Sequence, residues 1–117
     1  MGLDITLELT VKTGSVVSPE AHFEVFESSI THNLTEMAEA AGLYLPLWRP
    51  EELGVKSAGD LIPYLVKGIR IMKKNKEGLL KYSPKNNWGS FDDLLDVAST
   101  YLTACRQFPR AEIYVDR

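Results

Sequence analysis

Cysteine is nearly absent from this sequence: Cys105 is the single one, so no internal disulfide bond can form. Proline and glycine are also sparse, at 6 and 8 of 117 residues, as in a globular chain. No apolar run approaches the roughly 20 residues that cross a bilayer. The opening MGLDITLELT lacks the charged and apolar regions of a signal peptide. We therefore expect no membrane partner. A lone cysteine fits a reducing compartment, so we also expect a cytoplasmic protein.

Positive charge is not in excess either. Lys and Arg total 13 against 16 for Asp and Glu, which gives a formal net charge of -3. A non-specific nucleic-acid binder needs a basic surface to displace counterions, so this class is excluded. With 44% hydrophobic and 25% charged residues, the chain predicts one globular domain over residues 1–117.

Three segments have the alternating pattern of β-strands. Residues 4–11, DITLELTV, place Ile5, Leu7, Leu9 and Val11 on one side, as in a half-buried antiparallel strand. Residues 22–30 are rich in β-formers, and the tail AEIYVDR alternates again. We expect the tail to pair back into the sheet.

Three other segments have helical patterns. A short helix that starts within residues 30–38 is expected to end at Gly42. A second is expected from about Asp60 with Pro63 in its first turn, and a third from Phe91 behind a Ser90–Asp93 capping box. Residues 43–53, broken by two prolines, predict an irregular packed loop. The order predicts an α+β fold in which a small antiparallel sheet is packed on one face by about three helices.

Catalytic motifs are missing. The sequence contains no HExxH, CxxC, GxSxG, Walker loop or GxGxxG, so we predict no catalytic residue, no metal site and no cofactor. Cys105 lies on the apolar stripe of the last helix, which favours an inert buried thiol. His32, at the start of a helix, is the remaining candidate for a general base.

What the sequence does contain is three polar and aromatic clusters at junctions between elements. Each has a structural explanation, as a helix cap, a core plug or a turn. Their residue types also suit one kind of ligand. Asparagine amides match the edge of a nucleobase, tryptophan and tyrosine offer faces for stacking, and Arg49 or Lys85 near a helix N-terminus suits phosphate. The predicted ligand-binding residues are Thr31, His32, Asn33, Tyr44, Trp48, Arg49, Lys85, Asn86, Asn87 and Trp88.

We expect Thr31 to cap the helix while His32 and Asn33 face the ligand. The hypothesis requires six of these residues to line one pocket, within a chain or between chains: Thr31, His32, Asn33, Trp48, Arg49 and Trp88.

Four short motifs lie along the chain: DITLE at residues 4–8, SITHN at 29–33, NNWG at 86–89, and an Ala104-Cys105 pair followed by Pro109, Ala111 and Ile113. In these motifs the chain resembles, over nearly its whole length, a family of small proteins from tailed phages and prophages. Two positions depart from the pattern. Ser29 stands where the family often has Asn, and Asn87 where it often has Gly.

The resemblance implies a phage-encoded protein in the cytoplasm of an infected bacterial host. The family has no established reaction. By analogy with phage proteins that sequester nucleotide signals, the resemblance implies a homo-oligomeric anti-defence sponge that binds a small nucleotide-derived ligand. An alternative is a protein-binding inhibitor of a host factor, such as a host defence protein. A third is a small phosphodiesterase or hydrolase that uses His32 as its general base.

Overall fold

The computed structural model describes residues 2–117, in which a three-stranded antiparallel sheet has the order β2-β1-β3. The strands are β1 (Gly2–Lys12), β2 (Glu20–Thr31) and β3 (Glu112–Asp116). At the centre of the sheet, Leu7 of β1 lies opposite Phe26 on one side and Ile113 on the other. The pairing of the C-terminal tail with β1 is therefore confirmed.

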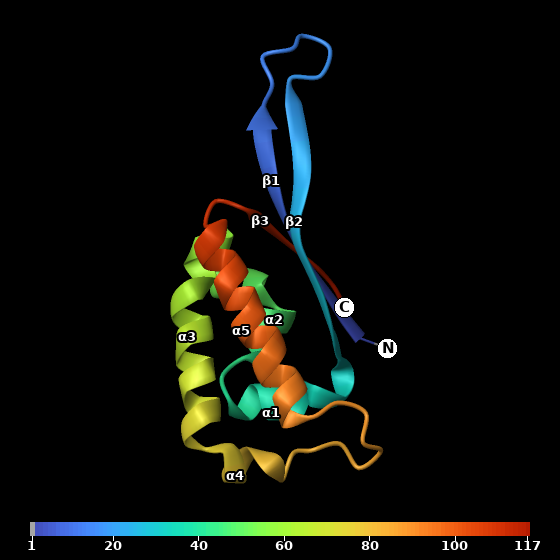
Figure 1. Cartoon of the computed structure of the whole chain (residues 1–117), viewed down its shortest axis with the longest axis vertical. Helices are drawn as coiled ribbons and strands as arrows, with labels where there is room; N and C mark the ends of the chain where they lie inside the picture. The colour runs from blue at the N-terminus through green and yellow to red at the C-terminus, as the bar shows by residue number, and fades with distance from the viewer. Residues whose placement is uncertain (1) are drawn as a thin grey trace.

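Helices cover one face of this sheet (Figure 1). Two long helices, α3 (Ala58–Lys74) and α5 (Phe91–Gln107), pack together, and three short ones complete the layer: α1 (Thr35–Ala40), α2 (Tyr44–Trp48) and α4 (Lys76–Leu80). Leu3, Ile5 and Leu7 of β1 are wholly buried beneath the layer. The expected α+β fold is confirmed. No helix in residues 2–117 combines the length and the apolar character needed to cross a bilayer.

Several helix positions predicted from the sequence differ from those in the structure. Residues 43–53 are not irregular: they form α2 and a 3-10 helix, η2 (Pro50–Leu53), because both prolines fall in first turns where no N–H is needed. Helix α3 begins at Ala58, since Ser57 and Asp60 form a complete capping box, which places Pro63 inside the helix. Helix α4 was not predicted. The short helix around Leu34 splits into a 3-10 turn, η1 (His32–Leu34), and α1.

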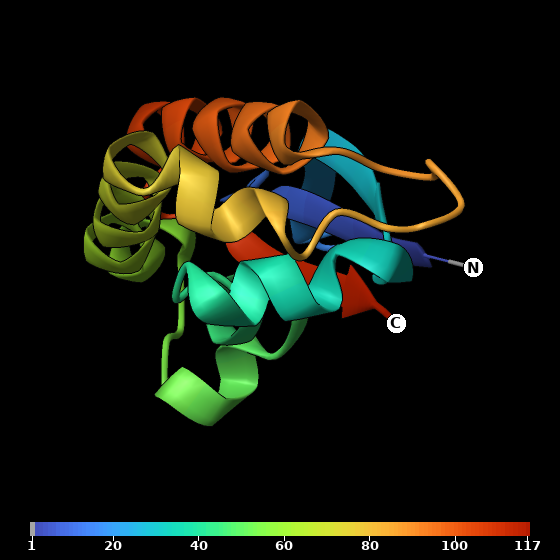
Figure 2. The ribbon, with the colours of Figure 1, turned by 90° about the horizontal axis from the view of Figure 1, so that it is seen from below.

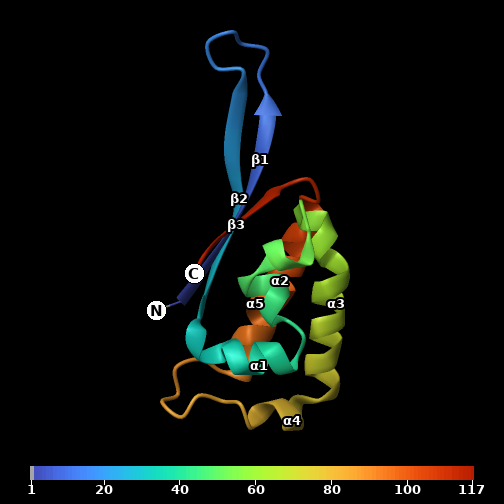
Figure 3. The ribbon, with the colours of Figure 1, turned by 180° about the vertical axis from the view of Figure 1, so that it is seen from behind.

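Strands β1 and β2 continue past the helical layer as a two-stranded hairpin, residues 9–23, which we call the arm (Figures 1 and 3). Strand β3 pairs with β1 only from Asp4 to Glu8, so the arm has no third strand. A register shift between Leu7 and Glu8 marks where the arm leaves the sheet. The arm accounts for the elongated outline, 56 × 27 × 22 Å.

Candidate functional site

The turn that joins β2 to η1 carries the first predicted cluster. The Thr31 hydroxyl accepts a hydrogen bond from the Asn33 backbone N–H at 3.2 Å, as expected for a cap. The Thr35 hydroxyl donates to the His32 carbonyl at 3.0 Å and tightens the same turn. These bonds fix the backbone of His32 and Asn33, so the two side chains leave the turn in defined directions.

His32 is tied to the second cluster. The Trp48 indole N–H donates to His32 Nδ1 at 2.9 Å, and Trp48 itself is 2% exposed. Because the indole nitrogen only donates, His32 Nδ1 carries no proton and Nε2 holds the ring hydrogen. In this arrangement His32 offers a donor rather than a general base, and Trp48 supports the turn from within the core.

Asn33 is tied to the third cluster. Its side-chain N–H donates to the Trp88 carbonyl at 3.4 Å, across 55 residues of sequence. The Asn86 side-chain oxygen accepts from the Trp88 N–H at 3.0 Å, and Asn87 adopts a φ of 60°. Asparagine tolerates this left-handed conformation better than most residues with a side chain. The loop therefore presents Trp88 at the surface, 67% exposed.

Gly89 lets the Trp88 loop approach η1. Its φ is +98°, and a Cβ atom there would lie 2.7 Å from the Thr31 methyl carbon and 3.0 Å from Leu34. Only glycine meets both requirements without displacing a neighbour. Close contact between the first and third clusters is thus built into the sequence at this position. Figure 2 shows η1, the α4–α5 connection and both chain ends on one side of the molecule.

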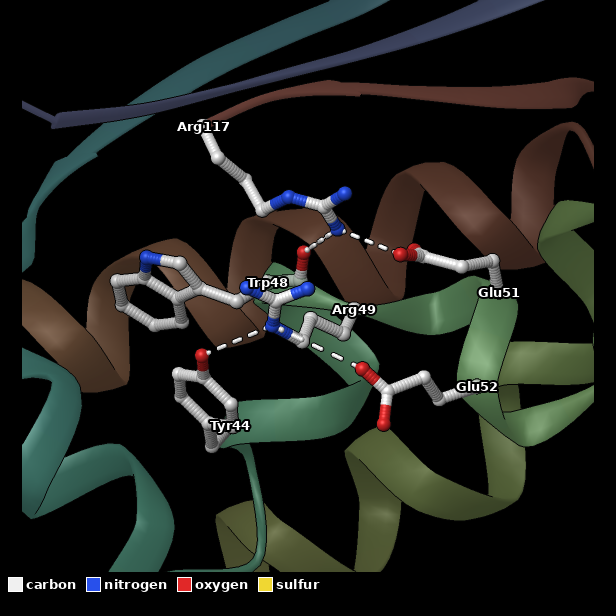
Figure 4. A network of polar contacts seen from close by, with 6 residues as sticks. All are labelled: Tyr44, Trp48, Arg49, Glu51, Glu52 and Arg117. Carbon is white, nitrogen blue, oxygen red and sulfur yellow. Dashed lines mark hydrogen bonds and ion pairs between the residues drawn. The ribbon is translucent and has the colours of Figure 1, made fainter.

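Helix α2 arranges the second cluster (Figure 4). The Tyr44 and Trp48 rings stack with centroids 5.7 Å apart and planes inclined by 12°. Arg49 Nε donates to the Tyr44 hydroxyl at 3.2 Å and lies 3.7 Å from Glu52 Oε2. The hydrogen bond to Tyr44 raises the pKa of Arg49 above its usual value. Arg49 is therefore held beside a stacked pair of aromatic rings, in an ion pair with Glu52.

Arg117 joins this cluster, although sequence reasoning missed it. Its Nη1 donates to the Trp48 carbonyl at 2.8 Å and to Glu51 Oε2 at 2.7 Å (Figure 4). The same contact lowers the pKa of Glu51. A single arginine at the end of a strand has no motif around it, so no sequence signal pointed to this contact. The guanidinium brings a second arginine–glutamate ion pair to the α2 surface.

Two hollows flank the exposed Trp88. One, of about 400 Å³, extends from β2 to the first turns of α5; the other, of about 340 Å³, extends along β2 to β1. They share Ser29, Ile30, Thr31 and Trp88. Both volumes fall within the range of small-molecule sites. Their charged lining is acidic: Asp93 and Asp96 in the first hollow and Asp4 in the second.

The three predicted clusters therefore meet in space, but they do not line one pocket. Thr31 and Trp88 border the hollows, Asn33 and Asn86 fix the loop, and His32 connects the turn to α2. Trp48 is buried, and Tyr44 borders a separate apolar hollow with Leu45 and Tyr64. Lys85 is exposed on the loop, and no side-chain hydrogen bond links it to the other clusters within residues 2–117.

Other reactive groups offer little chemistry. The described residues hold no group of three or more His, Cys, Asp or Glu side chains placed to bind a metal ion. Burial raises the pKa of Cys105 to about 12, which keeps its thiol protonated and inert at neutral pH.

Comparison with protein-family models, with curated proteins and with solved structures finds no match for this chain.

Proposed function

We propose that the protein binds and sequesters a small nucleotide-derived ligand on the surface formed by η1, α2 and the loop before α5. One observation carries the proposal: three polar and aromatic segments, far apart in sequence, are joined by the Trp48–His32 and Asn33–Trp88 hydrogen bonds. A helix cap alone would not require these two further contacts.

The base of the ligand would lie against Trp88. This indole is 67% exposed, and no other aromatic ring among residues 2–117 stacks on it. Stacking of a base on an aromatic side chain contributes roughly 1–3 kcal/mol. The Asn33 and Gly89 contacts hold the loop in place, so little conformational freedom is lost on binding.

The acidic lining of the hollows decides the orientation of the ligand. The carboxylates of Asp4, Asp93 and Asp96 accept hydrogen bonds from amino groups of a base or hydroxyls of a ribose, but they repel phosphate. Phosphate groups would instead lie toward α2, where the guanidinium groups of Arg49 and Arg117 would bind them in competition with Glu52 and Glu51. The proposed ligand therefore has a base at one end and its negative charge at the other.

A thermal-shift screen tests the proposal. The panel contains cyclic dinucleotides, cyclic mononucleotides, ADP-ribose derivatives and ordinary nucleotides, since the phage resemblance points to signals of bacterial defence. A ligand at about 100 times its Kd adds roughly 2.7 kcal/mol, or on the order of 10 °C in Tm. The hit should also quench Trp88 fluorescence. No shift across the panel, from a protein that unfolds cooperatively, would refute the proposal.

Matched variants locate the site. Trp88→Ala should abolish the shift, because it removes the stacking surface without opening the core. Phe23→Ala removes an aromatic ring of similar exposure, 54%, from the arm and should leave the shift unchanged. An equal loss in both variants would place the ligand elsewhere.

A second candidate function, inhibition of a host protein, is favoured by the face of the sheet that the helices leave open. Asp4, Glu24, Glu27 and Asp116 line a shallow hollow there, about 360 Å³, beside Tyr114. Such a surface is complementary to a basic partner. A partner recovered from host extract by wild type, and lost with Glu27→Lys/Asp116→Lys but not with Trp88→Ala, would establish this function instead.

A further inference from the structure

The arm exposes apolar side chains that the rest of the molecule leaves uncovered. Val16 and Val17, at its tip, are 98% and 96% exposed. Val11 and Phe23 follow on the ribbon at 46% and 54%. A two-stranded hairpin is at best marginally stable in water by itself. A contact that covers the tip would therefore stabilise both the valines and the ribbon that carries them.

A groove between α3 and α5 provides an apolar surface of suitable size. It has a volume of about 350 Å³ and an apolar floor formed by Val66, Ile69 and Leu102. Val66 and Leu102 are partly exposed there, and Ile69 is 9% exposed.

The rim of the groove is positively charged. Arg70, Lys73, Lys74 and Arg106 line it, and no carboxylate does. Within residues 2–117, ion pairs join only Arg49 with Glu52 and Arg117 with Glu51, so the four rim cations have no internal counter-charge. Arg70 and Lys74 are four residues apart on α3, a spacing at which like charges repel. An acidic partner would reduce the repulsion between these two charges.

The arm carries the opposite charge behind its tip. Glu20 lies on the arm opposite Lys12, and Glu8 and Glu24 face each other at its base; Lys12 is the single lysine or arginine of β1 and β2. The hairpin thus combines a bare apolar tip with an acidic base, and the groove combines an apolar floor with a basic rim. The two surfaces match in polarity and in charge. A polyanion such as DNA would match the rim alone, and the net charge of -3 opposes its approach.

We propose that the arm tip of one copy of this chain docks in the α3–α5 groove of a second copy, with Val16 and Val17 on the apolar floor and Glu20 and Glu24 against the basic rim. The contact joins two different surfaces, so a reciprocal pair of contacts closes a two-fold dimer and an unreciprocated one extends a chain. This assembly is independent of the ligand surface around Trp88.

Charge-reversed variants test the proposal by mass measurement. Wild type, followed by sedimentation velocity between about 1 and 100 µM at low salt, should form dimers or larger species that dissociate as salt is added. Glu20→Lys/Glu24→Lys and Arg70→Glu/Lys74→Glu should each be monomeric. An equimolar mixture of the two variants should recover a complex, because lysines on one arm then meet glutamates around the other groove.

Two controls keep the result interpretable. Glu36→Lys/Glu39→Lys reverses the same number of exposed charges on α1, away from both surfaces, and should assemble like wild type. Val16→Ser/Val17→Ser removes the apolar tip, has no core contact to lose, and should weaken assembly without changing Tm at low concentration. A wild type that stays monomeric throughout, or reversed variants that keep the wild-type mass, would overturn the proposal.

Discussion

The two halves of β1 have the same alternating pattern of apolar residues, but one half is buried and the other is exposed. Leu3, Ile5 and Leu7 are fully buried beneath the helices, whereas Val11, on the same side of the same strand, is 46% exposed. Alternation places all of these side chains on one face of the sheet. It does not determine how far the covering layer extends, because that depends on the lengths and directions of helices encoded elsewhere in the chain.

Thiol reactivity gives the largest expected contrast between body and arm. Cys105 in the body, with its pKa raised to about 12, is compared with a thiol placed on the arm by Val16→Cys in a Cys105→Ala background. At pH 8 an exposed thiol with pKa near 8.5 is partly ionised, whereas Cys105 is about 0.01% thiolate. We expect Cys105 to react with a disulfide reagent about a thousand times more slowly.

The pH dependence separates ionisation from simple obstruction. Because the pKa of Cys105 lies well above the range tested, its rate should rise about tenfold per unit from pH 7 to 9, while the arm thiol levels off near its own pKa. In denaturant the two rates should converge. Equal rates in the native protein would show that the body opens as readily as the arm.

Core truncation gives the next contrast. Leu7→Ala leaves a cavity under the helices and should lower the free energy of unfolding by about 2–5 kcal/mol. Val11→Ala, on the same face of β1 but beyond the helices, should change it by no more than about 0.5 kcal/mol. Urea denaturation at low protein concentration measures both while arm contacts between copies are absent. A loss above 2 kcal/mol for Val11→Ala would show that the arm is covered within one chain.

The same distinction explains what the sequence could predict. Strand alternation, the apolar stripes of α3 and α5 and the Gly42 stop are local patterns, and each was found in the fold. Helices α2 and α4 have five residues each and are stabilised by packing rather than by propensity, so their local signals were weak.

The candidate site divides in the same way. Its clusters were visible because each is a short run of unusual residues, and the Thr31 cap followed from position alone. The contacts between clusters span 16 and 55 residues, and no pattern encodes them. Arg117 reaches Trp48 across 69 residues and was missed for that reason.

The smallest contrast concerns one hydroxyl group in the body. Tyr101 is fully buried, its ring stacks on Phe26 at 5.4 Å, and its hydroxyl has no hydrogen-bond partner in residues 2–117. A buried polar group without a partner costs about 1–3 kcal/mol, so Tyr101→Phe should raise the free energy of unfolding by about 1 kcal/mol while the stack remains. Tyr114→Phe, whose exposed hydroxyl donates to Glu112 at 2.5 Å, should leave stability nearly unchanged. If Tyr101→Phe instead destabilises the protein, the hydroxyl makes a hydrogen bond in solution that the phenylalanine removes.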